Sequence, residues 1–340
     1  GKSYRGARSP LARLWLRVRM YVLYPLILAA KVLIPRREIL VVCSNTFYAP
    51  WVALRFNFSR QRKVVHLVYD LFPDALIESG SLRAGSLPCR LMDKLMRDIF
   101  RRADANVFLG RHLLEHARSR FAEIPRTVII PVGAVSAPFR HHSPERWEGP
   151  VTILYCGNLG RMHEYRTLLE ALAEGTWDGL RLAFHANGAL YGGLQKEVAA
   201  LPTASRERFQ FGENLPGQEW EAALLASPVA LVTMCPGAEK IVMPSKTYSA
   251  LLAGQAILAV TPLESDLAEL VRTHDCGWVV APGDVAGLRD ALREMLTTPE
   301  LLWQKRKNAY AAGHEFYSAE AVAGQWGELM KTIGDLGDRR

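Results

Sequence analysis

The chain has 340 residues, of which 49% are hydrophobic and 22% are charged, and its formal net charge is +8 at pH 7. This length accommodates two domains with a core in each, and the apolar content excludes a disordered chain. The five cysteines are scattered, and histidines do not cluster with cysteines or carboxylates at ligand spacing. We therefore expect a reducing compartment, no disulfide framework and no metal site.

The excess positive charge is confined to the first forty residues. They hold nine basic residues and a single acidic one, Glu38, whereas the remaining 33 basic and 33 acidic residues balance. A neutral body without a recognition motif makes nucleic-acid binding the least favoured function.

Residues 1–35 are predicted to form a basic amphipathic helix. Ser9 followed by Pro10 is typical of a helix start, with serine as N-cap and proline in the first turn. Only eleven uncharged residues separate Arg19 from Lys31. A membrane span needs about 20 apolar residues, so this segment is too short to cross a bilayer.

The same segment carries aromatic residues that favour a lipid–water boundary, namely Trp15, Tyr21 and Tyr24. We expect residues 10–35 to lie on an anionic membrane surface, which predicts a cytoplasmic protein that is peripheral on the inner face of the cell membrane. On this interpretation, removing the segment lowers vesicle binding while binding of the soluble donor persists. The alternative is a buried helix with a few solvated arginines.

After Pro35, short apolar runs alternate with amphipathic stretches, which predicts right-handed βαβ units and parallel sheets. The first half predicts strands at 38–44, 63–69, 106–109 and 127–131. The second half predicts strands at 151–156, 181–186, 208–211, 229–234, 255–260 and 277–280, followed by helices near 299–312 and 316–333.

The expected fold class is α/β, with two doubly wound, Rossmann-like domains facing a cleft. The N-terminal domain is expected at 36–140, a polar linker at 141–150 and the C-terminal domain at 151–312. Ligands of such sheets bind at the carboxyl ends of the strands, so the loops that follow the strands are the places to search.

Two glycine-containing loops in the second half are candidate phosphate sites. Gly157, Asn158 and Gly160 follow the first strand, and glycines at such a turn let backbone N–H groups approach a phosphate. Asn187 and Gly188 occupy the equivalent position one unit later. A plain tight turn explains either loop equally well.

The turn Pro244-Ser245-Lys246 is a more specific candidate. It opens a predicted helix, where backbone amides, a hydroxyl and an ammonium together would bind an anion. A lysine in the first turn opposes the helix dipole, which a bound anion would explain. The alternative is a solvated surface lysine.

Carboxylates and histidines of the first half give weaker signals. Asp70 follows a strand and is expected to point into the cleft, whereas Asp74 is expected to cap the following turn. His66, and likewise His185 in the second half, lie within predicted strands and are expected to be core or sheet-face residues rather than catalytic ones.

Six motifs follow one another along the chain: YDLFPD (69–74), FRRADANVFLG (100–110), VIIPVG (128–133), YCGNLG (155–160), PSKTYSALLAGQAIL (244–258) and CGWVVAPGD (276–284). In this order they resemble family 4 glycosyltransferases of the GT-B type, over residues 38–333. The resemblance implies transfer of a sugar from a nucleotide sugar, with retention of anomeric configuration and without a bound metal or cofactor. It places the nucleotide in the second domain and the acceptor in the first, and it implies that a C-terminal helix, residues 313–335, returns to the first domain.

The chain departs from the family at several positions. Counted without gaps, Asn158 and His163 stand where the family has a diphosphate-binding arginine and lysine. Ile241 and Ser249 stand where it has paired glutamates, so Ser249 is a weak substitute for the ribose ligand. The chain is more similar to a subgroup with a Pro-Ser-Lys signature, in which this turn supplies phosphate contacts.

Two further features concern an additional cation and the size of the first domain. Arg161 is an additional candidate cation beside the first loop. The first domain lacks the opening strand and Gly-rich loop of the family, so we expect either a trimmed chain or a reduced first domain.

The leading hypothesis is a glycosyltransferase that acts on a lipid-linked or cell-envelope glycan. Gly157–Gly160, Ser245 and Lys246 would stabilise the departing nucleoside diphosphate. Asp70 or Asn45 would orient the acceptor or contact the donor sugar. Two alternatives remain: a non-catalytic subunit or nucleotide-sugar-binding scaffold with the same fold, and a related two-domain enzyme such as a nucleotide-sugar epimerase.

Overall fold

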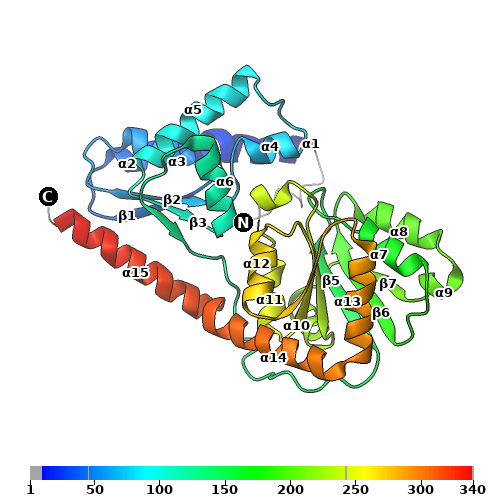
Figure 1. Ribbon diagram of the computed structural model, residues 1–340. Coiled ribbons are helices and arrows are strands. Elements are labelled where there is room, and N and C mark those ends of the chain that lie inside the picture. The colour runs from blue at the N-terminus through cyan, green and yellow to red at the C-terminus, as the bar shows by residue number, and fades with distance from the viewer. Residues whose placement is uncertain (1–9, 45, 242, 339–340) are drawn as a thin grey trace. The chain divides into compact units, whose positions relative to one another are not determined.

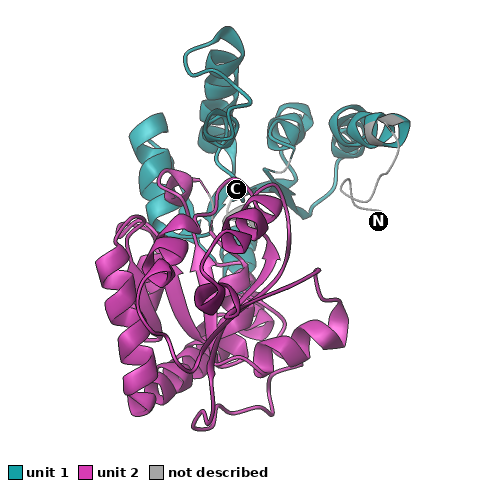
Figure 2. Ribbon diagram, turned by 90° about the vertical axis from the view of Figure 1, so that its right-hand side faces the viewer, with its two compact units in different colours: residues 1–130, 327–340 teal, residues 131–326 magenta. Residues whose placement is uncertain are grey.

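The computed structural model describes residues 10–44, 46–241 and 243–338. The chain divides into two compact units, residues 1–130 with 327–340 (unit 1) and residues 131–326 (unit 2), shown in Figure 2. Two predicted residues, the N-cap Ser9 and the site residue Asn45, lie outside the described residues.

Unit 1 contains a four-stranded parallel sheet in the order β1-β2-β3-β4. Because the order runs in one direction and parallel crossovers are right-handed, α3, α5 and α6 lie on the same side of this sheet (Figure 1). The four predicted strands are confirmed to within two residues. The elements are β1 (Ile39–Cys43), α3 (Ala49–Phe56), β2 (Lys63–Val68), α4 (Asp74–Glu78), α5 (Leu87–Arg102), β3 (Ala105–Phe108), α6 (Arg111–Phe121) and β4 (Thr127–Ile129).

The N-terminal helical segment comprises α1 (Pro10–Val18), the π-helical turn η2 (Arg19–Leu23) and α2 (Tyr24–Leu33). Leu28 and Val32 of α2 are buried against Val42 of β1 and Ala53 of α3, so α2 belongs to the core of unit 1. Among the described residues, no helix is both long enough and apolar enough to span a membrane.

Unit 2 contains a six-stranded parallel sheet in the order β10-β9-β8-β5-β6-β7. From β5 the chain first builds outward through β6 and β7, then returns to the other side of β5 and builds through β8, β9 and β10. The direction of winding therefore reverses between β5 and β8, which is the topological switch point of a doubly wound sheet. The strands are β5 (Val151–Asn158), β6 (Leu180–Asn187), β7 (Phe209–Gly212), β8 (Val229–Thr233), β9 (Ala256–Val260) and β10 (Gly277–Val280).

Hydrophobic cores lie on both faces of this sheet. One contains buried residues of α7, α8 and α13, and the other contains residues of α11, α12 and α14. The helices are α7 (Arg166–Ala173), α8 (Tyr191–Ala199), α9 (Thr203–Arg206), α10 (Gly217–Leu225), the 3-10 turn η3 (Ala238–Lys240), α11 (Lys246–Leu252), α12 (Asp266–Thr273), α13 (Val285–Thr297), α14 (Pro299–Phe316) and α15 (Ala319–Asp338). The residues of α15 from Gly327 onward group with unit 1.

The boundary between the units falls at residue 130, before the polar stretch 141–150 that was expected to link them. The intervening residues pack on unit 2. Phe139 is fully buried in one of its hydrophobic clusters, and the Arg306 guanidinium donates to the carbonyls of Gly254 and Glu145 at 3.0 and 2.7 Å. The polar composition of 141–150 therefore marks a surface segment that is bonded to unit 2.

Candidate functional site

The loops that leave β5 and β8 are joined by a histidine at the switch point. Nδ1 of His163 lies 2.8 Å from the carbonyl oxygen of Thr233, the last residue of β8. Because a carbonyl can only accept, Nδ1 carries the proton. Burial, together with the charge of Lys246, lowers the pKa of His163 to about 4. His163 is therefore neutral near pH 7. It does not supply the positive charge of the diphosphate-binding lysine that the family has at this position.

Lys246 turns its ammonium into the protein. Its Nζ is buried 3.6 Å from the centroid of the Tyr155 ring and has no hydrogen-bond partner among the described residues. Burial lowers the pKa of Lys246 from 10.5 to about 7. The alternative of a solvated surface lysine is therefore wrong. Since α11 has only seven residues, we attribute no anion site to its helix dipole.

A pocket within unit 2 opens beside this ammonium. Lys246 and Ser249 line it together with Cys156, Trp220 and Gln255, and its lining contains no carboxylate. Burial raises the pKa of the Cys156 thiol to about 11, so this thiol is uncharged near pH 7. The pocket therefore offers Lys246 no protein counterion.

Gly188 and Asn187 hold the loops after β5 and β6 together. The Leu159 amide donates to the carbonyl of Asn187 at 2.6 Å. Gly188 has φ of +117°, and a Cβ there would lie 2.6 Å from the Leu159 carbonyl oxygen and 2.8 Å from Oδ1 of Asn158. A Cβ on Gly160 would lie 2.8 Å from the amide nitrogen of the same asparagine side chain. At Gly188 only glycine permits this approach, because the neighbour is backbone and φ is positive, whereas the Asn158 side chain beside Gly160 can move.

The remaining predicted residues of the second half are spread around this region. Gly157, which pairs with Ala186 in the β5–β6 ladder, has φ of +120° and open space where a Cβ would stand. Pro244 is buried, whereas Ser245 is exposed and makes no side-chain cap to α11. Arg161 is exposed as well. Among the candidate cations of the donor site, Lys246 is thus the one that is buried.

In unit 1, Ser44 fixes the positions of the residues that follow β2. Its Oγ accepts hydrogen bonds from the amides of Tyr69 and Asp70 at 2.9 and 3.1 Å. Asp70 is half-buried, and burial raises the pKa of its carboxyl group. In the described part of the chain no side chain pairs with this carboxylate, so it is available to a ligand.

The other polar candidates of unit 1 have structural partners. Asp74 pairs with His116 at 3.5 Å and with Arg120 at 3.3 Å, so it joins α4 to α6 rather than only capping a turn. His66 is fully buried, with Nδ1 3.3 Å from Oδ1 of Asn106. The prediction that His66 is a core residue is confirmed.

Sequence reasoning missed Tyr155, Thr233 and Ser44. Tyr155 reads as one more apolar strand residue, and Thr233 simply ends a strand. The signal that identifies both is their place near the carboxyl ends of the two strands that flank the switch point. That signal exists only once the strand order is known.

Comparison with known proteins gives one relative in sequence. No family profile matches the chain. Over 244 residues the chain is 29% identical to the probable glycosyltransferase WbjE of Pseudomonas aeruginosa, a match that covers 68% of this chain and 60% of that protein. The chain thus spans less than two thirds of its relative's length.

Solved structures with the same fold are more numerous. Sucrose-phosphate synthase of Thermosynechococcus elongatus has a TM-score of 0.67 at 16% identity, covering 87% of this chain and 73% of that one. HepE of Anabaena, solved with UDP, has a TM-score of 0.69 at 14% identity, covering 89% and 82%. The predicted α/β fold with two parallel sheets, and the resemblance to GT-B glycosyltransferases, are confirmed. The prediction that both domains are doubly wound holds for unit 2 only, because the strand order of unit 1 runs in one direction. The Pro-Ser-Lys subgroup stays a prediction.

Proposed function

We propose that the chain is a glycosyltransferase that moves a sugar from a nucleoside-diphosphate sugar to a hydroxyl group of an acceptor. One observation carries the proposal: the buried ammonium of Lys246 has no hydrogen-bond partner among the described residues and lies beside the switch point of unit 2. Doubly wound sheets bind their ligands at this point.

A diphosphate supplies what the ammonium lacks. A buried charge without a partner is costly, and a phosphate oxygen that accepts from Nζ removes that cost. When the bond between the anomeric carbon and the diphosphate oxygen breaks, negative charge grows on the departing diphosphate. The fixed ammonium of Lys246 stabilises this charge more strongly than water would.

The comparisons support uridine diphosphate sugars as the first donors to test. HepE has been solved with UDP and with UDP-glucose, and WbjE bears the name of a glycosyltransferase. In this chain Ser249, which lines the pocket with Lys246, would meet the nucleoside more weakly than the family's glutamate does.

The acceptor would meet unit 1, where the carboxylate of Asp70 can accept a hydrogen bond from an acceptor hydroxyl. We propose a lipid-linked or cell-envelope glycan as the acceptor, at the inner face of the cell membrane. We further propose that the sugar retains its anomeric configuration and that Lys246 stabilises the leaving group without a resident metal or cofactor. Asn45 stays a candidate for contact with the donor sugar.

The test is calorimetric titration of UDP into the wild type and two variants. Lys246→Met keeps the length of the side chain and removes its charge, whereas Lys240→Met removes an exposed lysine of η3 in the same unit. Loss of a hydrogen bond to a charged group predicts that UDP binds Lys246→Met about 10- to 100-fold more weakly. Lys240→Met should bind as the wild type does. Equal UDP affinity in Lys246→Met would refute the proposed site.

A second measurement separates an enzyme from a non-catalytic scaffold. The wild type is incubated with UDP-sugars, and released UDP is quantified with and without glycan acceptors. UDP release by the wild type that disappears in Lys246→Met supports the transferase. Tight UDP binding without any donor turnover would favour the scaffold.

A further inference from the structure

We propose that α1, η2 and α2 form a lipid-binding surface that seats unit 1 on an anionic bilayer. This surface would hold the proposed glycosyltransferase at the membrane. That the membrane is the cell membrane rests on the proposed function. All residues that form this surface belong to unit 1.

Helix α2 is apolar on two opposite faces. Pro25, Leu28 and Val32 form the buried face that packs into unit 1. On the other side, Leu26 and Ile27 are 61% and 56% exposed. A surface helix of a globular domain normally carries polar residues on its outer face. The outer face of α2 is instead suited to a second apolar environment.

Helix α1 extends this exposed apolar surface. Leu11, Leu14 and Trp15, spaced as one stripe along a helix, are 78%, 58% and 59% exposed. None of the described side chains of α1 is buried. Hydrophobic burial within unit 1 therefore does not account for this amphipathic helix, whereas partition into a lipid surface does.

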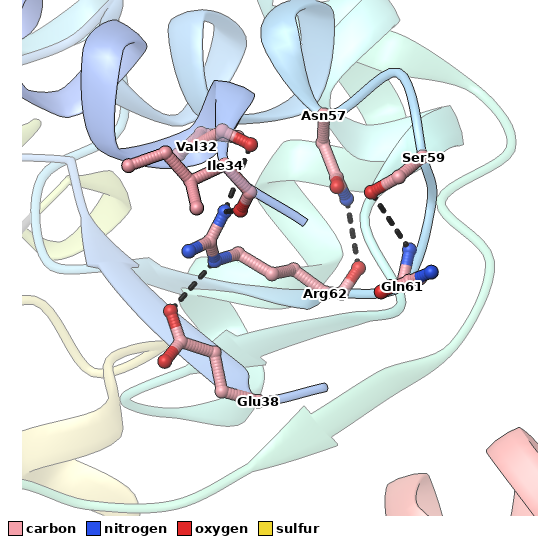
Figure 3. A network of polar contacts seen from close by, with 7 residues as sticks. All are labelled: Val32, Ile34, Glu38, Asn57, Ser59, Gln61 and Arg62. Carbon is pink, nitrogen blue, oxygen red and sulfur yellow. Dashed lines mark hydrogen bonds and ion pairs between the residues drawn. The ribbon is translucent and has the colours of Figure 1, made fainter. Parts of the chain in front are cut away.

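The end of α2 is fixed to unit 1 by a buried arginine, as Figure 3 shows. Arg62 is 4% exposed, and its Nη1 donates to the carbonyls of Val32 and Ile34 at 2.8 and 2.6 Å. Its Nε donates to Oε1 of Glu38 at 2.6 Å. The guanidinium thus satisfies carbonyls that a helix end leaves without donors and fixes the direction of the helix.

The turn between α1 and α2 is attached at a second point. Pro25 has no N–H, so the carbonyl of Tyr21 loses its usual helical donor. The hydroxyl of Tyr48, at the start of α3, donates to that carbonyl instead. The segment of α1, η2 and α2 is therefore an integral part of the fold of unit 1. Removing residues 1–35 would expose the core and take from Arg62 its two carbonyl acceptors, so the predicted survival of ligand binding after truncation is not expected.

Charge selects anionic lipid as the occupant. The exposed cations Arg19, Lys31, Arg36 and Arg37 border the surface, and Glu38, the one acidic residue between 10 and 40, is bonded to the Arg62 guanidinium. Lipid phosphates meet these cations while the acyl boundary receives the apolar side chains. A second copy of the chain would bring like charges together, and a nucleic acid offers nothing to the aliphatic face.

The test uses sedimentation of the full chain with vesicles of phosphatidylcholine, with and without phosphatidylglycerol. Leu26→Ser with Ile27→Ser removes two exposed apolar side chains from α2. Leu87→Ser with Leu91→Ser is the matched control, because these leucines are 81% and 59% exposed on α5 of the same unit. We expect the α2 pair to weaken binding at least about tenfold and the control pair to leave it unchanged.

A charge variant tests the second half of the proposal and keeps it falsifiable if the α2 pair fails to fold. Arg36→Ser with Arg37→Ser should weaken binding to vesicles with phosphatidylglycerol by about fivefold per cation, and should not affect binding to phosphatidylcholine alone. Wild-type binding by either variant pair would overturn the inference. Concentration-dependent dimerisation that the α2 pair abolishes would overturn it too, in favour of a second copy.

UDP titration separates this inference from the proposed function. All three variant pairs should bind UDP as the wild type does. A wild type that binds vesicles but not UDP would refute the transferase and leave the lipid surface standing. A wild type that binds UDP but no vesicles would refute the lipid surface alone.

Discussion

Replacing Lys246 by methionine should stabilise the unliganded protein while it weakens donor binding. Methionine keeps an unbranched side chain of similar length beside the Tyr155 ring and removes a buried charge without a hydrogen-bond partner. Most substitutions at buried positions destabilise, so a gain is a demanding expectation. Residues that serve a ligand rather than the fold commonly show this trade-off.

The magnitude follows from the pKa of Lys246, which burial lowers from 10.5 to about 7. Each pKa unit corresponds to about 1.4 kcal/mol, so the charged lysine costs the folded state on the order of a few kcal/mol, part of which the contact with Tyr155 offsets. A net gain of about 1 kcal/mol would raise the Tm of a domain of this size by about 2–4 °C.

The sign of the pH dependence identifies the cause. Between pH 7 and 10.5 the unfolded lysine binds a proton that the folded one has lost, so wild-type stability rises with pH through this window. The advantage of Lys246→Met is therefore largest below about pH 7 and shrinks as the pH rises. Scanning calorimetry from about pH 6 to about pH 9 measures it, with Lys246→Arg as the charged control. If the Tm of Lys246→Met lies below that of the wild type by the same amount at every pH, the reasoning is refuted.

Three further predictions concern the fold. Arg62→Met should lower the free energy of unfolding, measured by urea titration, by about 2–4 kcal/mol, because two helix-end carbonyls and a carboxylate lose their donor. The control Arg102→Met removes an exposed ion pair and should lower the free energy of unfolding by less than about 1 kcal/mol. Gly188→Ala should lower the Tm in a fluorescence melt and weaken UDP binding, while Gly192→Ala, with open space at its Cβ, should leave both unchanged. Burial lowers the pKa of His66 from 6.5 to about 4, so stability should fall as the pH drops from 6.5 to 4, and urea midpoints of His66→Gln should show a flatter fall.

Local patterns predicted the strands and helix ends. The fully buried strands β8 and β9 are apolar throughout except for Thr233 at the end of β8, which is the pattern of a parallel sheet covered on both faces. Gly254 follows the end of α11 as a glycine of positive φ typically does, with φ of +68° and its amide bonded to the carbonyl of Leu251. Such features depend on residues a few positions apart, so a single sequence contains their causes.

The two aspartates that follow β2 show where local reasoning stops. Asp70 and Asp74 both flank the same short turn, and the sequence could rank them only by position. The structure distinguishes them because α6 brings His116 and Arg120 to Asp74, whereas no described side chain pairs with the Asp70 carboxylate. Both partners of Asp74 lie on α6, and the sequence around Asp74 does not show how that helix packs against it.

From the sequence alone one can read which segments are apolar, where charge gathers and that Lys246 follows a Pro-Ser turn at a predicted helix start. Tertiary structure decided that the Lys246 ammonium is buried on Tyr155 beside the switch point, because strand order brings β5 and β8 together. It also decided which face of α2 packs inward, because Arg62 fixes the end of that helix. The spacing of apolar and charged residues is a property of short stretches of sequence. The environment of a side chain depends instead on segments that lie far apart in the chain.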